Sequence, residues 1–460
     1  MSTHSLTLEK HQSMQQRMPD RRGDIQKTAH PHVGLGVANA AFCVDDTIRG
    51  VPAGTVSLAA SDVAGFGWSV SGGDLSYPVL TVSGSAYNGN RDAMFAYARE
   101  HGALLAPHIK TPMSVDVAHD LMDAGAWGVS VANLQQASVM LRGGVNRLLI
   151  ANQLGGKRMG DGLGCLLNAY PDAEVVLFAD SEASLAVADR AGEISGRVFP
   201  VLVEVGLGRA GLRDVEQARK VIGKALTLKH VRLGGVAAYE GAVASADPAA
   251  TVEAIRNLND LLKSVFDLVR SAVPERRLVL SSGGSQYFDL VVDALSPLAR
   301  ADGNIDLILR SGAIFFHDHG VYAQALERMD ARNGFVSGGD AACVFQPAMR
   351  VWAQVLSRPE SDLAICGIGM RDVSFDQGFP LALKSWRDGL CNATLDGFAE
   401  VEKLNDQHGF LRLKQSVDVK VGDIIEFGIS HPCTCFDRWR HFFVLDDNHR
   451  VTSMHATSFG

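Results

Sequence analysis

The sequence predicts an α/β protein in which a (β/α)8 barrel of the TIM type is followed by an antiparallel β domain. The first observation is that short apolar runs alternate with helical segments between about residues 77 and 315. The second is a change after about residue 335, where glycine-rich turns separate short runs of alternating hydrophobicity. We therefore divide the chain into a polar N-terminal arm (1–30), a segment expected to join the β domain (31–76), the barrel (77–325) and the β domain (326–460).

The barrel is predicted from eight short apolar runs of the kind that is buried on both faces of a parallel sheet. These strands are expected at 103–109, 127–131, 147–152, 174–179, 198–205, 231–238, 278–282 and 305–310. Helices are expected between them at 115–126, 133–144, 181–192, 215–226 and 252–273, the last with Ile255, Leu258 and Leu262 at helical spacing. About 250 residues is the usual size of a closed barrel, and an open doubly wound sheet is the alternative.

The β domain is predicted from short alternating segments in the C-terminal part of the chain. They lie at 348–359, 363–370, 393–406, 409–433 and 440–447. Within them, VKVGDIIEFGI (419–429) predicts a strand, a turn at Gly422 and Asp423, and a second strand.

Composition and charge exclude several classes of function. The formal net charge of -8 is spread along the chain, so nucleic acid is not an expected partner. No apolar run approaches the roughly 18 residues of a membrane span, and no secretory signal is visible at the N-terminus. The seven cysteines are scattered, which indicates reduced thiols rather than a disulfide framework. We expect a cytoplasmic protein that binds neither membranes nor nucleic acid.

Polar side chains follow the predicted strands, where a barrel enzyme collects its catalytic groups. His108 and Lys110 follow the first strand, Asn133 the second and Gln153 the third. The loop SSGGS (281–285) follows the seventh strand, where barrels often bind phosphate through backbone N–H groups and hydroxyls. A lysine and a phosphate loop at one barrel mouth point to pyridoxal 5′-phosphate (PLP), whose aldehyde forms a Schiff base with an amine. A solvated strand-end lysine is the alternative, which spacing alone favours.

The segment HPC near the C-terminus contains a possible metal pair, His431 and Cys433. Residues two positions apart on an extended segment point their side chains to the same side. Histidine and cysteine are both good ligands for Zn²⁺ or another divalent metal. Two protein ligands leave positions open, as in a catalytic zinc site, whereas an ordinary β segment is the alternative. Cys435 is either a spare thiol or a competing ligand. His408 and the cluster 317–319 are further metal or acid/base candidates, with a loop role favoured for the cluster.

Several motifs together resemble those of the D-serine dehydratase and D-threonine aldolase family. They are LLAPHIKT, VEVGLGRAG, AAYEG, LSSGGS, LRSGAIFFHDHG, LNDQHG and SHPCTCFDRWR, in the order expected of that family from about residue 77 to the C-terminus. The family consists of fold-type III PLP enzymes related to alanine racemase. The resemblance implies a PLP-binding barrel, a β domain, and a head-to-tail homodimer whose sites lie near the subunit interface.

The resemblance also implies roles for individual residues. Lys110 matches the lysine that binds PLP and then acts as the base at Cα. Arg209 matches an arginine near the phenolic oxygen of the cofactor, and Tyr239 matches a tyrosine beside its pyridine ring. These three are the catalytic candidates. The candidate cofactor-binding residues are Lys110, His108, Gln153, Arg209, Tyr239, Ser282, Gly283 and Gly284, with the last three forming the phosphate loop.

A zinc pair with the pattern His-x-Cys resembles the dehydratase branch, whereas the aldolase branch typically has His-x-Asp. We therefore expect β-elimination of water from a D-3-hydroxy amino acid such as D-serine, giving an oxoacid and ammonia. Lys110 would be the general base, and Zn²⁺ on His431 and Cys433 would polarise the β-hydroxyl. A D-threonine-type aldolase, which gives glycine and an aldehyde, is the nearest alternative. A non-catalytic PLP-binding protein is an alternative of another class. The β domain and the HPC segment argue against it.

The lysine motif departs from the family pattern at one position. Many relatives have a histidine after Lys-Thr, whereas Lys110 and Thr111 are followed here by Pro112, which has neither an imidazole nor a backbone donor. The bulky Ile109 precedes the lysine. Substrate identity is therefore open, and a β-hydroxy D-amino acid larger than serine is an alternative.

Overall fold

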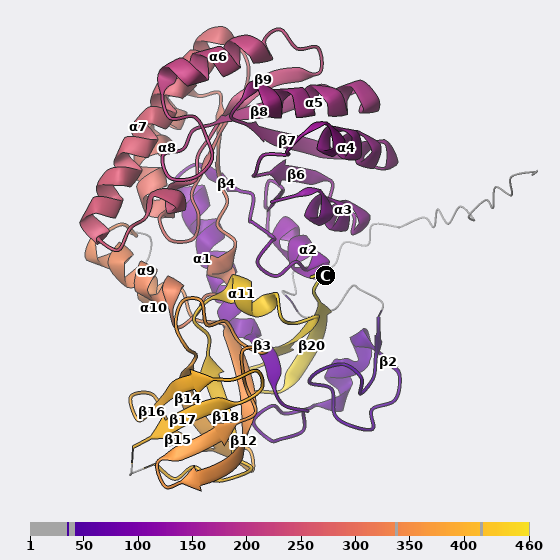
Figure 1. Cartoon of the computed structure of the whole chain (residues 1–460), viewed down its shortest axis with the longest axis vertical. Coiled ribbons are helices and arrows are strands. Elements are labelled where there is room, and N and C mark those ends of the chain that lie inside the picture. The colour runs from indigo at the N-terminus through magenta and orange to yellow at the C-terminus, as the bar shows by residue number, and fades with distance from the viewer. Residues whose placement is uncertain (1–34, 36–41, 336–338, 415–416, 460) are drawn as a thin grey trace, which may run out of the picture. The chain divides into compact units, whose positions relative to one another are not determined.

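The computed structural model describes Leu35 and residues 42–335, 339–414 and 417–459, drawn as coloured ribbons in Figure 1. The predicted polar arm (1–30) lies outside the described residues. No helix in the described part of the chain is both long and apolar enough to cross a membrane.

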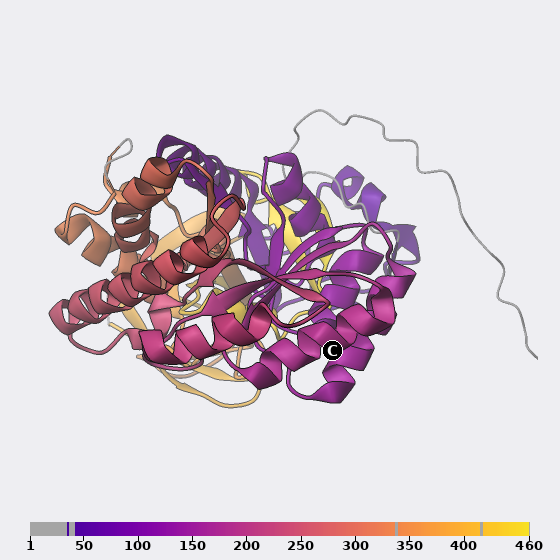
Figure 2. The same cartoon turned by 90° about the horizontal axis from the view of Figure 1, so that it is seen from above.

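The eight predicted barrel strands are present in one parallel sheet (Figure 2). They are β4 (Ala103–Leu105), β5 (Val129–Val131), β6 (Arg147–Ile150), β7 (Glu174–Ala179), β8 (Phe199–Glu204), β9 (Val231–Ala237), β10 (Leu278–Ser282) and β11 (Ile305–Leu309). The sheet order β4-β11-β10-β9-β8-β7-β6-β5 places the first strand beside the last. The barrel is therefore confirmed, and the open doubly wound sheet is excluded.

The barrel closes between β4 and β5 through the residues that follow β4. The N–H of Ile109 donates to the carbonyl of Ser130 (2.9 Å), and the N–H of Ser130 donates to the carbonyl of Pro107 (2.9 Å). These bonds form a parallel bridge between His108 and Ser130. The segment that leads into Lys110 is therefore part of the barrel wall.

Helices follow the strands and lie outside them in Figure 2. The barrel helices are α1 (Gly84–Glu100), α2 (Val115–Asp123), α3 (Leu134–Arg142), α4 (Lys157–Ala169), α5 (Glu182–Ser195), α6 (Val215–Ala225), α7 (Pro248–Ala272) and α8 (Phe288–Asp302), followed by α9 (Val321–Ala331) and α10 (Ala341–Val344). In α7, the predicted apolar face is buried, and Asp247 caps the N-terminus by accepting a hydrogen bond from the N–H of Ala249 (2.9 Å). The helices predicted from periodicity are present.

The β domain is built on a sheet of largely antiparallel strands. It contains β12 (Met349–Glu360), β13 (Leu363–Cys366), β14 (Leu381–Arg387), β15 (Leu390–Thr394), β16 (Ala399–Leu404), β17 (Gly409–Leu413), β18 (Ile424–Gly428), β19 (His441–Leu445), β20 (Val451–Ala456) and β3 (Val79–Ser83). The sequence assigned the residues of β3 to the barrel. In the structure β3 instead pairs antiparallel with β12 and parallel with β19, so the chain enters the barrel only after this strand.

The predicted hairpin at 419–429 is only half correct. Its second half is β18, but residues 417–420 form no strand. Strand β18 pairs with β12 on one side and with β14 on the other, so neither edge is free for the preceding segment. Asp423 instead fixes the turn, because its carboxylate accepts hydrogen bonds from the N–H of Lys420 (2.8 Å) and from Arg387 (2.7 and 2.8 Å).

The described part of the N-terminal segment packs against the β domain without adding a strand to its large sheet. Strands β1 (Cys43–Val44) and β2 (Leu58–Ala59) pair only with each other. Apolar residues of this segment, such as Val63 and Val70, share a small core with Trp352 and Phe443 of the sheet. The expected association is therefore made through side chains rather than through strand pairing.

Candidate active site

Lys110 lies in a tight turn directly after the segment that closes the barrel. The carbonyl of Ile109 accepts a hydrogen bond from the N–H of Met113 (2.9 Å), and Met113 has a φ of 40°. Thr111 and Pro112 are buried in the turn, whereas the Lys110 side chain is exposed. The turn therefore presents the amine to solvent from a fixed backbone.

The surroundings of Lys110 lower its pKa. The largest cause is the protein atoms around the amine, which displace part of its water although the side chain stays accessible; the Cys433 thiolate opposes this shift, and the positive charges of Arg209 and Arg310 add to it. The pKa of His108 is lowered well below its usual value by burial and then by the charge of Lys110. A lowered lysine pKa increases the fraction of free amine, which is the form that attacks an aldehyde.

Arg209 and Tyr239 lie together in the loops that follow β8 and β9. The guanidinium carbon of Arg209 is 5.0 Å from the centre of the Tyr239 ring. The Arg209 loop packs so closely on the next loop that a Cβ on Gly208 would lie 2.0 Å from the carbonyl oxygen of Ala242. Burial, followed by the charge of Glu240, raises the pKa of Tyr239 to about 12, so its phenol stays protonated at neutral pH.

The predicted phosphate loop converges its donors on a single anion, the carboxylate of Glu240. The hydroxyl of Ser282 donates to Oε2 (2.9 Å), the N–H of Gly283 donates to Oε2 (3.1 Å), and the N–H of Gly284 donates to Oε1 (2.5 Å). Gly283 has a φ of 89°, a conformation that favours glycine and turns both N–H groups the same way. We call these three donors the anion cradle. Its geometry suits an anion, and a carboxylate of this chain occupies it.

A buried cation, Arg310, lies below the cradle at the end of β11. Its guanidinium donates to the hydroxyl of Ser281 (2.7 Å) and to the carbonyl of Ala238 (2.6 Å). Burial lowers its pKa, and the charges of Glu240 and Glu204 oppose that shift. Sequence reasoning gave no role to Arg310, although a charge that ends a buried apolar strand is the same signal that singled out Lys110.

Gln153 and Asn133, both predicted from their places after strands, have different roles. The side-chain amide of Gln153 donates to the carboxylate of Glu204, whose pKa is raised by burial, and so lies with the charged groups of the barrel mouth. Asn133 is the N-cap of α3 and accepts a hydrogen bond from the N–H of Gln136 (2.9 Å). Its side chain therefore starts a helix.

His431 and Cys433 lie at the start of the short helix α11 (Pro432–Phe436). The predicted extended segment is wrong for Cys433, because Pro432 at the first helical position starts a helix and only His431, the N-cap, has an extended backbone (φ -157°). The His431 side chain is nevertheless hydrogen-bonded to Cys433, and its Nδ1 lies 2.7 Å from Oδ2 of Asp376. Asp376 thereby fixes the orientation of the imidazole, as carboxylates do beside metal-binding histidines.

The environment of this pair favours a thiolate. Burial raises the pKa of Cys433, but the hydrogen bonds from His431 and Thr111 and the nearby charge of Lys110 outweigh it and lower the pKa. Burial lowers the pKa of His431, but the Cys433 and Asp376 contacts outweigh it and raise the pKa to about 9. The distance of 3.2 Å between Thr111 Oγ1 and Cys433 Sγ joins the lysine turn to the pair.

The described residues contain no group of three or more His, Cys, Asp or Glu that is arranged to hold a metal ion. The pair alone would therefore leave most coordination positions open. Cys435 has a separate environment, because its buried thiol lies 3.9 Å from the carbonyl of Asp372 and burial raises its pKa to about 12. His408 is exposed in the turn between β16 and β17.

The cluster 317–319 contributes a helix cap. Oδ1 of Asp318 accepts hydrogen bonds from the N–H groups of Gly320 (2.8 Å) and Tyr322 (2.9 Å), which lie at the start of α9. The Nδ1 of His317 accepts a hydrogen bond from the N–H of Asp318 (2.6 Å). These local bonds give the cluster the loop role that the sequence favoured.

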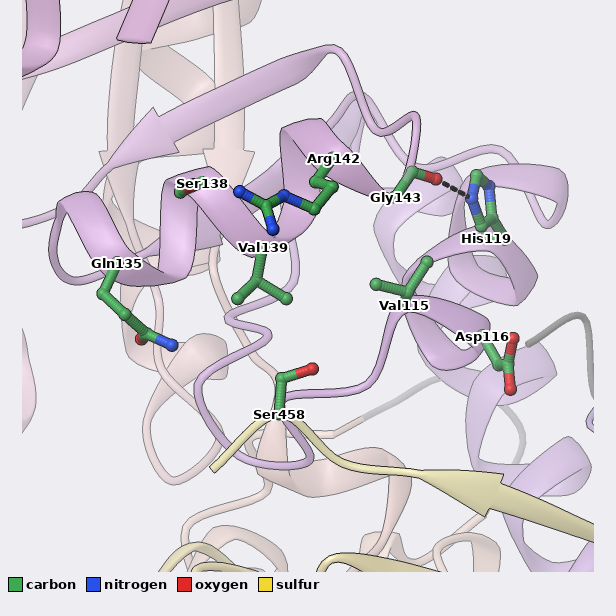
Figure 3. A pocket seen from close by; sticks show the side chains of 9 residues that line it. All are labelled: Val115, Asp116, His119, Gln135, Ser138, Val139, Arg142, Gly143 and Ser458. Carbon is green, nitrogen blue, oxygen red and sulfur yellow. Dashed lines mark hydrogen bonds between the residues drawn. The ribbon is translucent and has the colours of Figure 1, made fainter. Parts of the chain in front are cut away.

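A cavity of about 650 Å³ lies between α2, α3 and the C-terminal segment, lined by residues such as His119, Arg142 and Ser458 (Figure 3). In Figure 3 the imidazole of His119 points to the carbonyl of Gly143, to which it is hydrogen-bonded (2.7 Å). None of the predicted site residues lines this cavity. The candidate active site is therefore the barrel mouth, not this cavity.

The chain matches two known protein families, one over the barrel and one over the β domain. Residues 82–293 match the family described as "Alanine racemase, N-terminal domain", and residues 348–445 match "Putative serine dehydratase domain". A barrel of this kind with a lysine after its first strand defines the class of fold-type III PLP enzymes. The matches to both domain models and to the relatives below confirm the resemblance of the motifs to the D-serine dehydratase and D-threonine aldolase family.

Relatives of known activity are lyases. A D-threonine aldolase from Arthrobacter sp. is 24% identical over 373 residues, which cover 80% of this chain and 89% of the relative. A D-threo-3-hydroxyaspartate dehydratase from Delftia sp. (strain HT23) is 29% identical over 162 residues, 34% of this chain and 40% of the relative. The crystal structure of a D-threonine aldolase from Filomicrobium marinum has the same fold, with a TM-score of 0.70, 22% identity, and coverage of 85% of this chain and 97% of that one. The comparisons support the lyase class for this chain.

Proposed function

We propose that this chain is a PLP-dependent lyase of D-3-hydroxy amino acids that eliminates water, with a divalent metal ion, Zn²⁺, held by His431 and Cys433. The observation that carries elimination over carbon–carbon cleavage is a cysteine with a lowered thiol pKa, Cys433, two positions after an imidazole that Asp376 orients. Solved structures of a D-threo-3-hydroxyaspartate dehydratase include alanine variants of a histidine and of a cysteine two positions apart, the cysteine variant in a metal-free form. The same spacing separates His431 from Cys433.

The residues of the barrel mouth fit PLP. Lys110 offers an amine with a lowered pKa, Tyr239 and Arg209 flank the space beyond it, and the anion cradle provides donors for a phosphate, with the Glu240 carboxylate as the stand-in anion. Bound PLP supplies an electron sink for the negative charge that develops at Cα. In this arrangement Lys110 removes the Cα proton of the substrate, because its lowered pKa increases the fraction of free amine and its backbone is fixed to the closed barrel wall.

The residues of α11 fit an open metal site. Asp376 orients His431, and the neighbours of Cys433 lower the pKa of its thiol, which favours the thiolate that a metal ion binds. Because the pKa of His431 is raised to about 9, a bound metal ion would replace the proton that the imidazole carries at neutral pH. A bound metal ion supplies Lewis acidity toward a substrate hydroxyl. The Thr111–Cys433 contact holds the turn that bears the base against the metal ligands. We further propose a homodimer, as the family resemblance implies, and a cytoplasmic location, as the scattered cysteines indicate.

A second candidate function is retro-aldol cleavage, favoured by the greater coverage of the aldolase relatives: 80% of this chain for the Arthrobacter enzyme against 34% for the Delftia dehydratase. Both reactions use the same cofactor and begin from the same substrate class. Product analysis therefore separates them more directly than any further comparison.

The test is to supply purified protein, PLP and Zn²⁺ with D-serine, D-threonine and D-threo-3-hydroxyaspartate. We expect an oxoacid and ammonia, and at least a hundredfold loss of rate in Lys110→Ala and in Cys433→Ser, since each removes a group that acts in the chemical step. Lys220→Ala, on the exposed face of α6, and Cys435→Ser are the matched controls.

Glycine and an aldehyde as the main products would establish the aldolase instead. Activity that survived both Lys110→Ala and removal of metal by EDTA would overturn the proposal altogether. Uptake of PLP without turnover of any of the three substrates would favour the non-catalytic alternative.

A further inference from the structure

The anion cradle is already satisfied by the chain itself. All three donors bond to the Glu240 carboxylate, and the Glu240 side chain is fully buried. Each N–H or O–H donates one good hydrogen bond, so a phosphate and this carboxylate cannot both take the same donors. A phosphate and a carboxylate that both lay at the cradle would also repel each other strongly, because the site contains little water. Phosphate binding at the cradle therefore requires Glu240 to move.

The surroundings explain why Glu240 occupies the cradle without phosphate. A buried carboxylate is stable only when it is hydrogen-bonded and balanced by positive charge. The cradle provides the hydrogen bonds, and the buried Arg310 is close enough that its charge interacts with Glu240. The same two features, convergent N–H groups and a nearby cation, are those that a phosphate needs.

We propose that Glu240 is a displaceable counter-anion of the cradle: its carboxylate holds Ser282, Gly283 and Gly284 when cofactor is absent and leaves them when phosphate binds. Glu240 therefore sets how tightly the chain holds PLP. The displaced carboxylate stays beside Arg310, which balances its charge. This inference rests on the proposed function, because it assumes that the cradle takes the phosphate of PLP.

The test compares Glu240→Gln with wild type in binding rather than in turnover. The amide keeps the shape of the side chain but loses its charge and brings an NH₂ group against three donors, so it competes less well with phosphate. We expect the dissociation constant of PLP, measured by absorbance titration of the cofactor-free protein, to fall about tenfold. The inhibition constant of inorganic phosphate against PLP binding, obtained from titrations at several phosphate concentrations, should also fall about tenfold. Pyridoxal, which lacks the phosphate, should bind equally to both proteins.

Glu204→Gln is the matched control. Glu204 is also buried and also interacts with the charge of Arg310, but it bonds to Gln153 and not to the cradle. We expect Glu204→Gln to leave the competition by phosphate unchanged. An equal gain in both variants would mean that general electrostatics governs PLP affinity, and it would overturn the role of Glu240.

Glu240→Asp provides a second variant if the glutamine variant does not fold, as judged by circular dichroism. It keeps the charge but is one methylene shorter and reaches fewer donors, so we expect a smaller gain in PLP affinity of the same sign. Unchanged or weaker PLP affinity in folded Glu240 variants, with pyridoxal binding intact, overturns the inference. Failure of wild type to take up PLP or pyridoxal overturns the proposed function instead.

Discussion

The pKa of Lys110 depends on residues that are distant in the sequence. Arg209 and Arg310 come from other barrel strands, and Cys433 comes from the β domain. The place of Lys110 at a strand end made it a candidate, because a charge after a buried apolar run is visible in the sequence, but only the family resemblance favoured it over a solvated lysine. The role of Glu240 was not visible, because its hydrogen bonds reach donors 42 to 44 residues away.

A prediction at this scale concerns the pH at which Lys110 becomes reactive. The positive charge of Arg209 lowers the pKa of Lys110 by disfavouring its protonated form, so Arg209→Gln removes that effect and raises the pKa. The midpoint of the pH profile for PLP uptake, followed by absorbance, should therefore move to higher pH than in wild type. Lys224→Gln, in the last turn of α6, is the control and should leave the midpoint in place. A midpoint that falls in Arg209→Gln would contradict this electrostatic account.

At the scale of the element, tertiary packing accounts for a helix that the sequence pattern did not predict. Helix α4 contains Gly160, Gly162 and Gly164, which lower helix propensity, and it was not among the predicted helices. Its glycines allow close packing on α5: a Cβ on Gly164 would lie 2.7 Å from Cβ of Ile194. The periodic helices, by contrast, were predictable because their apolar faces are continuous in the sequence.

This packing predicts opposite effects for two identical substitutions. Gly164→Ala forces α4 and α5 apart and should destabilise the protein by about 1–3 kcal/mol. Gly223→Ala lies inside α6, where a Cβ meets no atom within 4 Å, and should stabilise it by about 0.5–1 kcal/mol through helix propensity. Urea unfolding of both variants measures the two changes, and equal signs would refute the packing argument.

At the scale of the whole molecule, a buried polar network joins the two halves of the described fold. His455 in β20 is fully buried; its Nδ1 lies 2.8 Å from Oδ2 of Asp116 in α2, and its Nε2 lies 2.9 Å from Oγ of Ser453. The alternation of strands and helices predicted both domains, but it carries no information about which side chains meet between them. The architecture was therefore predictable from the sequence, whereas this contact was not.

Breaking the network should affect the barrel and the β domain together. His455→Ala leaves the buried Asp116 carboxylate without its imidazole and creates a cavity, so we expect a loss of about 3–5 kcal/mol. Ser453→Ala removes a single hydroxyl and should cost only about 1 kcal/mol. Denaturant unfolding followed by both tryptophan fluorescence and circular dichroism measures these losses. A His455→Ala variant as stable as wild type would show that the network contributes nothing to stability.

The closure of the barrel by Pro107 and Ile109 against Ser130 has a consequence for how this enzyme can diversify. The segment that closes the barrel leads directly into Lys110, so the reactive amine is not carried on a separate flexible loop. Mutations that move Lys110 would open the barrel and would prevent folding. New substrates must therefore be accommodated by changes in the β domain and its short helix α11, while the amine stays where the barrel holds it.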